Sequence, residues 1–156
     1  DKFKAIYANA FFYDRNGTAV WPAQNINFTN KTQFLFRISK GTLNVNDNDV
    51  NRYFPKESIR IPFDNIVYIG DSQTDIPCMK LVTSLGGQAI GVYDPKLKNK
   101  ERVHSLIRDK RIKYFAPADY SKNKELEKLL KQIIDYSKAS FALKQEYYKN
   151  LEESEL

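Results

Sequence analysis

A chain of 156 residues, 42% hydrophobic and 13% aromatic, can bury one core and is short for two domains. That composition excludes a disordered chain, the apolar runs are too short to cross a membrane, and one cysteine excludes a disulfide framework or zinc cluster. The 25 basic and 19 acidic side chains give a net charge of +6, which suits an anionic small molecule. The basic residues gather at 96–113 without an RNA-binding motif, so we expect no nucleic-acid partner.

The first residues bear on the cellular compartment and on the architecture of the N-terminal part. Asp1, Lys2 and Lys4 open the chain with charge and no apolar signal segment follows, so we expect a cytoplasmic protein that does not contact the membrane. Residues 7–21 read as two extended runs around Asn16-Gly17, a dipeptide that tolerates the positive φ of a hairpin turn. Trp21 could line a substrate cap or plug the hairpin against the core, and we expect the plug.

The next segment, "KTQFLFRISKG" at 31–41, has two interpretations. It is helical if Phe34, Leu35 and Ile38 form one face, and Gly41 would then end the helix. A strand remains the competing interpretation, because short aromatic-rich runs are ambiguous. The polar, asparagine-rich residues 42–55 are expected to form a loop over the surface.

From residue 66 the pattern alternates between strand and helix. Strands are expected at 66–70, 88–93 and 112–117, and helices at 76–86, 100–110 and 124–138. The last helix is amphipathic, and the charged residues 138–156 could continue it as a tail that frays. This alternation predicts an α/β protein with a partial doubly wound, Rossmann-like parallel sheet, an N-terminal hairpin and a long C-terminal helix. We expect residues 1–156 to form a single, partial domain.

Two aspartates flank the point where the strand at 66–70 ends and the next helix begins. Asp71 follows Gly70 directly, and Asp75 comes one helical turn later. Ligands of open parallel sheets bind beyond the carboxyl ends of the strands, so we expect the Asp71 carboxylate to face that crevice, with Gly70 bending the backbone. Mg²⁺ takes one or two carboxylates with waters and phosphate oxygens, which makes Asp71 a candidate ligand. Asp75 could hold a metal-bound water or orient a lysine.

Structural roles can explain the same residues. Asp75, with Thr74 and Pro77 beside it, could cap the helix. Asp71 could close a local turn through its own side chain. A G-D-x-x-x-D pattern is weak alone, and the strand before it and the helix after it strengthen the functional interpretation.

The stretch "IVYIGDSQTDIPCM" resembles the fourth signature motif of the haloacid dehalogenase-like (HAD) phosphohydrolases, in which a hydrophobic strand runs into G-D-x-x-x-D. Asp71 matches the motif's metal-ligating aspartate and Asp75 its second acid. The family's third signature is an upstream lysine near the start of a helix, which Lys31 matches better than its competitor, Lys40. The order of these parts resembles the phosphoserine-phosphatase-like branch, and the resemblance covers residues 31–134.

The resemblance implies a Mg²⁺-dependent phosphatase that hydrolyses a phosphomonoester through an aspartyl-phosphate. Asp71 would bind Mg²⁺, Lys31 would contact phosphate, and Asp75 would support the metal's water shell or orient Lys31. The family's nucleophile lies in a D-x-D motif after a first strand. The D-x-D of this chain, Asp47 to Asp49, follows the lysine and no strand precedes it. We therefore expect this chain to be the C-terminal part of a longer protein and to be inactive on its own.

Two interpretations compete with the phosphatase. A non-catalytic α/β module would bind a nucleotide or a protein, its acids would serve as caps, and Lys31 would lie on the far side of the sheet from Asp71. A receiver domain phosphorylated on aspartate shares the sheet and an acid-plus-lysine site. Its lysine, however, follows the acceptor aspartate, whereas Lys31 precedes Asp71, so we rank it last. Substrate identity and oligomeric state stay open at this level.

Overall fold

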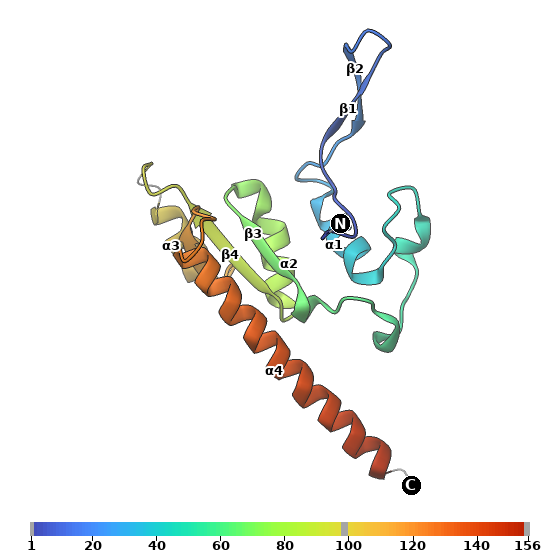
Figure 1. Ribbon diagram of the computed structural model, residues 1–156, viewed down its shortest axis with the longest axis vertical. Coiled ribbons are helices and arrows are strands. Elements are labelled where there is room, and N and C mark those ends of the chain that lie inside the picture. The colour runs from blue at the N-terminus through green and yellow to red at the C-terminus, as the bar shows by residue number, and fades with distance from the viewer. Residues whose placement is uncertain (1, 98–99, 155–156) are drawn as a thin grey trace.

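The strand and helix alternation predicted from residue 66 onward is confirmed in the computed structural model, which describes residues 2–97 and 100–154 (Figure 1). The strands are β1 (Ala10–Tyr13), β2 (Ala19–Gln24), β3 (Val67–Gly70), β4 (Gln88–Tyr93) and β5 (Tyr114–Pro117). The helices are α1 (Lys31–Lys40), α2 (Ile76–Ser84), α3 (Lys100–Arg108) and α4 (Glu125–Ser154). Parts of three predicted segments lie outside the described residues. They are residue 1 of the predicted domain, residues 98 and 99 of the basic run, and residues 155 and 156 of the tail. In the described part, no helix is both long and apolar enough to cross a membrane.

A three-stranded parallel sheet in the order β3-β4-β5 forms the centre of the fold. Every residue of the central strand β4 is buried. Since successive strand residues point to opposite faces, Ala89 and Tyr93 pack against α2 and α3, and Ile90 and Val92 pack against α4. Helices on both faces of a parallel sheet are the doubly wound arrangement that the sequence predicted.

Helix α1 packs beside α2, on the same face of the sheet, and the strand alternative for this segment is wrong. Leu35 belongs to a buried cluster with Ile66, Cys78 and Val82. The helix ends where Gly41 adopts a left-handed conformation, with φ of 80°. In Figure 1, α1 lies beyond β3 at the edge of the sheet, and no strand of the described chain lies beneath it.

The predicted loop at 42–55 is confirmed, and a buried cation anchors it. The Arg37 side chain is nearly inaccessible (the residue is 4% exposed) and donates hydrogen bonds to several backbone carbonyls of this loop. Its acceptors are the carbonyl oxygens of Thr42 (3.4 Å), Asn44 (2.7 Å), Val45 (2.8 Å) and Asp47 (2.9 Å). The D-x-D rejected as a nucleophile motif is part of the same loop, where the Asp47 side chain accepts a hydrogen bond from Asp49 N. That aspartate pair therefore has a local structural role.

Replacing Arg37 with methionine is expected to lower the free energy of unfolding by about 2 kcal/mol, because buried carbonyls lose charged donors. Urea denaturation measures the change, and limited proteolysis should show faster cleavage within 42–55. Arg108→Met, which removes an exposed arginine paired with Glu101, is the control. Equal effects of the two substitutions would contradict the anchoring role.

The N-terminal hairpin forms as predicted but projects away from the body (Figure 1). Gly17 has φ of 79°, and the Asp14 carboxylate accepts hydrogen bonds from Asn16 N and Thr18 N, which together close the turn. Trp21 pairs across the hairpin with Phe12 and is 70% exposed. The expectation that Trp21 plugs the hairpin against the core is therefore wrong. The hydrogen bonds of the turn hold the two strands together, but they do not determine which surface the hairpin packs against.

Helix α4 confirms the long C-terminal helix that the sequence predicted. The amphipathic segment predicted at 124–138 continues as one α-helix of 30 residues to Ser154. Its first half covers the sheet through Leu126 and Ile133, whereas every residue from Phe141 to Ser154 is exposed.

Candidate functional site

The site begins where β3 ends, at the carboxyl end of the sheet. Gly70 has a strand conformation, and its importance lies in the absence of a side chain. A Cβ atom there would come within 2.6 Å of Met79 Cε and 2.8 Å of Asp75 Cβ. Gly70 therefore allows the turn that carries Asp75 to lie directly against the strand, in place of the bend that we expected.

Asp75 and Lys31 meet at this turn although 44 positions separate them in the sequence. Lys31 is the first residue of α1, and its Nζ atom lies 2.8 Å from Asp75 Oδ1. Tyr68, from β3, donates its hydroxyl to the same oxygen at 2.8 Å. Ser72 donates its backbone N–H (3.0 Å) and its hydroxyl (2.7 Å) to Asp75 Oδ2. Asp75 thus closes a capping box with Ser72 and also orients Lys31, so the capping role and the lysine-orienting role coexist.

The four hydrogen bonds determine the ionisation of Asp75. Burial raises the pKa of this carboxyl group, but donation from Lys31, Ser72 and Tyr68 outweighs it and lowers the pKa to about 2. Burial and the hydrogen bond to Asp75 raise the pKa of the Tyr68 hydroxyl, which therefore stays protonated. Asp75 is consequently a carboxylate at every pH near neutrality.

The lowered pKa of Asp75 predicts how stability depends on pH. Because the pKa falls from 3.8 to about 2 on folding, the ionised carboxylate stabilises the native state above pH 4, and this contribution disappears as the pH falls towards 2. The difference in free energy of unfolding between the wild type and Asp75→Asn should shrink by about 2 kcal/mol from pH 5 to pH 2. Urea titrations at fixed pH values measure it. A difference that is constant with pH would show that Asp75 is not stabilised as the carboxylate.

Asp71 contrasts with Asp75. Asp71 is exposed, and among the described residues its carboxylate accepts no hydrogen bond and joins no ion pair. Each Asp75 oxygen already accepts two hydrogen bonds, which leaves Asp71 as the acid of this pair with free oxygen atoms. Within residues 2–97 and 100–154, no group of three histidine, cysteine or acidic side chains could hold a metal. A metal ion here would therefore take Asp71 and complete its coordination with water, phosphate or other polypeptide.

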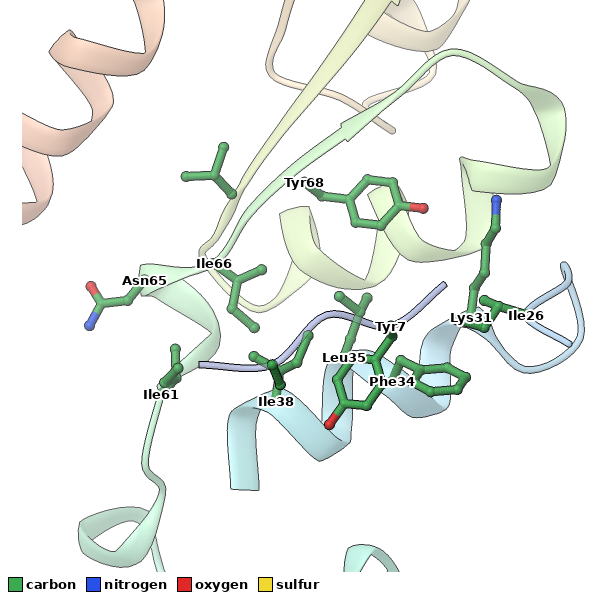
Figure 2. A pocket seen from close by; sticks show the side chains of 12 residues that line it. Tyr7, Ile26, Lys31, Phe34, Leu35, Ile38, Ile61, Asn65, Ile66 and Tyr68 are labelled. Atoms are coloured by element: carbon green, nitrogen blue, oxygen red, sulfur yellow. The ribbon is translucent and has the colours of Figure 1, made fainter. Parts of the chain in front are cut away.

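A groove of about 570 Å³ lies between α1 and the edge of β3 (Figure 2). Apolar side chains dominate its lining, and the Lys31 side chain rises at one end of it towards the start of α2 (Figure 2). Asp71 does not line this groove. Lys31 nevertheless lies at the carboxyl end of β3 with the acids, and not on the far side of the sheet as the non-catalytic alternative required.

The sequence-based candidates did not include Tyr68, Ser72 or Thr74. Thr74 Oγ1 lies 2.6 Å from Ser72 Oγ and 3.5 Å from Lys31 Nζ, so the hydroxyl groups extend the network around Asp75. Tyr68 lies in an apolar strand and looked like a core residue, although a tyrosine hydroxyl in such a strand needs a partner. Lys40, the competitor of Lys31, donates to the carbonyls of Val50 and Arg52 in the 42–55 loop and is not part of the site.

Comparisons with known proteins leave the family of the chain open. No family model and no solved structure gives a significant match to it. A curated protein of Borreliella burgdorferi (strain ATCC 35210), described as "Uncharacterized protein", is 29% identical over 101 residues, which make up 65% of this chain and 34% of that protein. The chain therefore spans about a third of the length of this relative.

Proposed function

We propose that this chain contributes the metal-binding acid and the phosphate-binding lysine of a Mg²⁺-dependent HAD-like phosphatase that hydrolyses a phosphomonoester. The observation that carries the proposal is the convergence of Lys31 with Asp75 at the carboxyl end of β3. Asp71 directly follows this strand, and among the described residues its carboxylate has no partner. These three side chains match the family's third and fourth signature motifs in type and order. Open parallel sheets bind their ligands at this end of the strands.

Lys31 is suited to phosphate because an ammonium group has three donors. One donor is directed to Asp75 and a longer contact reaches Thr74, so a further N–H can meet a phosphate oxygen. The ionised Asp75 fixes the position of Lys31 and keeps its charge at the strand end, which makes Asp75 a positioning residue. Asp71 would hold Mg²⁺, which when bound would neutralise part of the charge on the phosphoryl group.

The nucleophile is expected on polypeptide outside residues 1–156. The D-x-D in this chain is engaged in the loop that Arg37 anchors, away from Lys31. Residues 1–156 alone should therefore show no turnover. A cytoplasmic location suits the buried, unpaired Cys78, because a reducing compartment preserves a free thiol.

A non-catalytic module that binds a nucleotide or a protein is the second candidate. The capping box between Ser72 and Asp75 favours it, because this box explains the second acid of the motif without any chemistry. It does not explain why Lys31 comes from another element to the same carboxylate.

Hydrolysis of p-nitrophenyl phosphate by the full-length protein tests the proposal. We expect turnover with Mg²⁺, its loss after treatment with EDTA, and its return when Mg²⁺ is added in excess. Residues 1–156 alone, assayed in parallel, should be inactive. Turnover that EDTA does not affect would contradict the dependence on Mg²⁺, and a panel of phosphomonoesters without any turnover would favour the non-catalytic module.

A further inference from the structure

Helix α4 carries an inference that does not depend on phosphatase activity. We propose that two copies of the protein pair through α4. The two helices run antiparallel about a two-fold axis near Ser140, and one stripe of side chains on each copy meets the same stripe on the other. The acidic end of each helix then lies beside the basic start of the other.

The contact surface is a row of side chains along one side of α4, which we call the α4 stripe. It consists of Leu129, Gln132, Tyr136, Leu143, Tyr147 and Asn150. At 3.6 residues per turn, these side chains point in nearly the same direction. Tyr136 is 63%, Leu143 74% and Tyr147 62% exposed. A continuous row of exposed, large apolar side chains marks an interaction surface on a globular protein.

The described part of the fold does not cover the α4 stripe. Leu126 and Ile133 pack on the sheet, and Lys144 pairs with Asp64, so these side chains mark the face of α4 that turns towards the body. The α4 stripe lies roughly 80° around the helix from that face. Figure 1 shows the second half of α4 extending away from the sheet. A projecting helical segment such as 141–154 is marginally stable in water by itself, and a packing partner would stabilise it.

The spacing of the α4 stripe fits an antiparallel copy of itself. Successive members are 3, 4, 7, 4 and 3 residues apart, so the spacing reads the same from either end. When two such helices run antiparallel, Tyr136 lies opposite Leu143 of the other copy, and Gln132 lies opposite Tyr147. Ser140, at the centre, is small and allows the two helices to approach closely. Because each copy uses the same surface, the contact is isologous and closes as a dimer.

The charges of α4 favour the antiparallel direction. Residues 122–131, at the start of the helix, contain four lysines and two glutamates, whereas residues 145–154 contain three glutamates and one lysine. An antiparallel pair places the acidic end of each helix beside the basic start of the other, so the attraction occurs twice. A parallel pair would place like charges side by side, which is unfavourable. The charge distribution therefore complements a second copy of the same helix.

The groove at the edge of β5 belongs to the same surface. Its volume is about 330 Å³, and Glu125 and Leu129 of α4 line it together with Ile107 and Phe115. Leu129 is also the first member of the α4 stripe, so the stripe continues into the groove. In the antiparallel pair, Asn150 of one copy lies opposite Leu129 of the other. The last turns of each helix thus cover the groove of the other copy.

Sedimentation equilibrium of the full-length protein tests the inference. We expect a dimer at micromolar concentration, and we expect Leu143→Lys with Tyr147→Lys to convert it into a monomer. Ala142→Lys with Gln145→Lys adds the same charge on the opposite side of α4 and should leave the dimer intact. All of these residues are exposed, so circular dichroism should show that both variants are folded. A monomeric wild type, or equal effects of the two variants, would overturn the inference, because polypeptide outside residues 1–156 would then be left as the only partner for the stripe.

Cysteine cross-linking with a mild oxidant tests the direction of the pair. The Ser140→Cys substitution lies near the two-fold axis, where the two Cα atoms can come within the distance that a disulfide spans, so we expect a covalent dimer on a non-reducing gel. Tyr147→Cys should not cross-link to itself, because antiparallel helices hold its two copies roughly 20 Å apart. Combined with Gln132→Cys, it should cross-link. Cross-linking of Tyr147→Cys alone, or none from Ser140→Cys, would overturn the antiparallel arrangement.

Discussion

Replacing Asp71 with asparagine should lower kcat for phosphomonoester hydrolysis by the full-length protein by roughly 100- to 1,000-fold. Asparagine keeps the size of the side chain but removes the negative charge that would hold Mg²⁺. Because Asp71 is exposed and makes no hydrogen bond among the described residues, the fold does not depend on this charge. Steady-state kinetics across a range of Mg²⁺ concentrations measures the effect, and the concentration required for half-maximal rate should rise.

Two controls distinguish loss of the site from loss of the fold. One is the stability of the Asp71→Asn variant, and the other is the same substitution at another exposed aspartate. The free energy of unfolding of Asp71→Asn should stay within about 0.5 kcal/mol of the wild type, as for other exposed substitutions. Asp135→Asn removes an exposed carboxylate from α4 and should leave kcat unchanged. If Asp71→Asn folds normally and hydrolyses the substrate at the wild-type rate, the assignment of Asp71 as the metal ligand is wrong.

The elements with strong local signals could be predicted from the sequence. The apolar runs that became β3 and β4 are bounded by glycines or aspartates, and the period of Leu126, Leu130 and Ile133 indicates one helix face. These features depend on neighbouring residues, and the boundaries of the two strands shifted by at most one position. The α/β class followed from their alternation.

Features that depend on distant contacts could not be predicted in the same way. The pairing of Lys31 with Asp75 was suggested by a family resemblance, because sequence spacing does not report where two elements meet. Nothing in the sequence indicates that Arg37 is buried, because its burial depends on a loop that folds back over it. Trp21 was misjudged because the turn of a hairpin fixes its strands but not the surface against which the hairpin lies.

The second large effect concerns the ion pair itself. Lys31→Met would leave the Asp75 carboxylate, whose side chain is 8% exposed, without its cation, and we expect a loss of about 3 kcal/mol of unfolding free energy. Asp75→Asn should cost a similar amount, because Lys31 loses its partner and Ser72 loses a charged acceptor. The double variant should cost less than the sum of the two, by about 1–3 kcal/mol, since neither charge is then left alone.

An ion pair on the surface shows whether the coupling depends on burial or only on the distance between the two charges. Lys131 and Glu127 lie 2.9 Å apart on α4, close to the 2.8 Å of Lys31 and Asp75, but in a more solvated setting. The same double-mutant cycle, with two single variants and the double variant at Lys131 and Glu127, should show no coupling free energy beyond the error of urea denaturation. If Lys31 and Asp75 couple no more strongly than this surface pair, the carboxylate does not hold the lysine in place. Lys31 would then lack the fixed position that phosphate binding requires, and the capping box alone would account for Asp75.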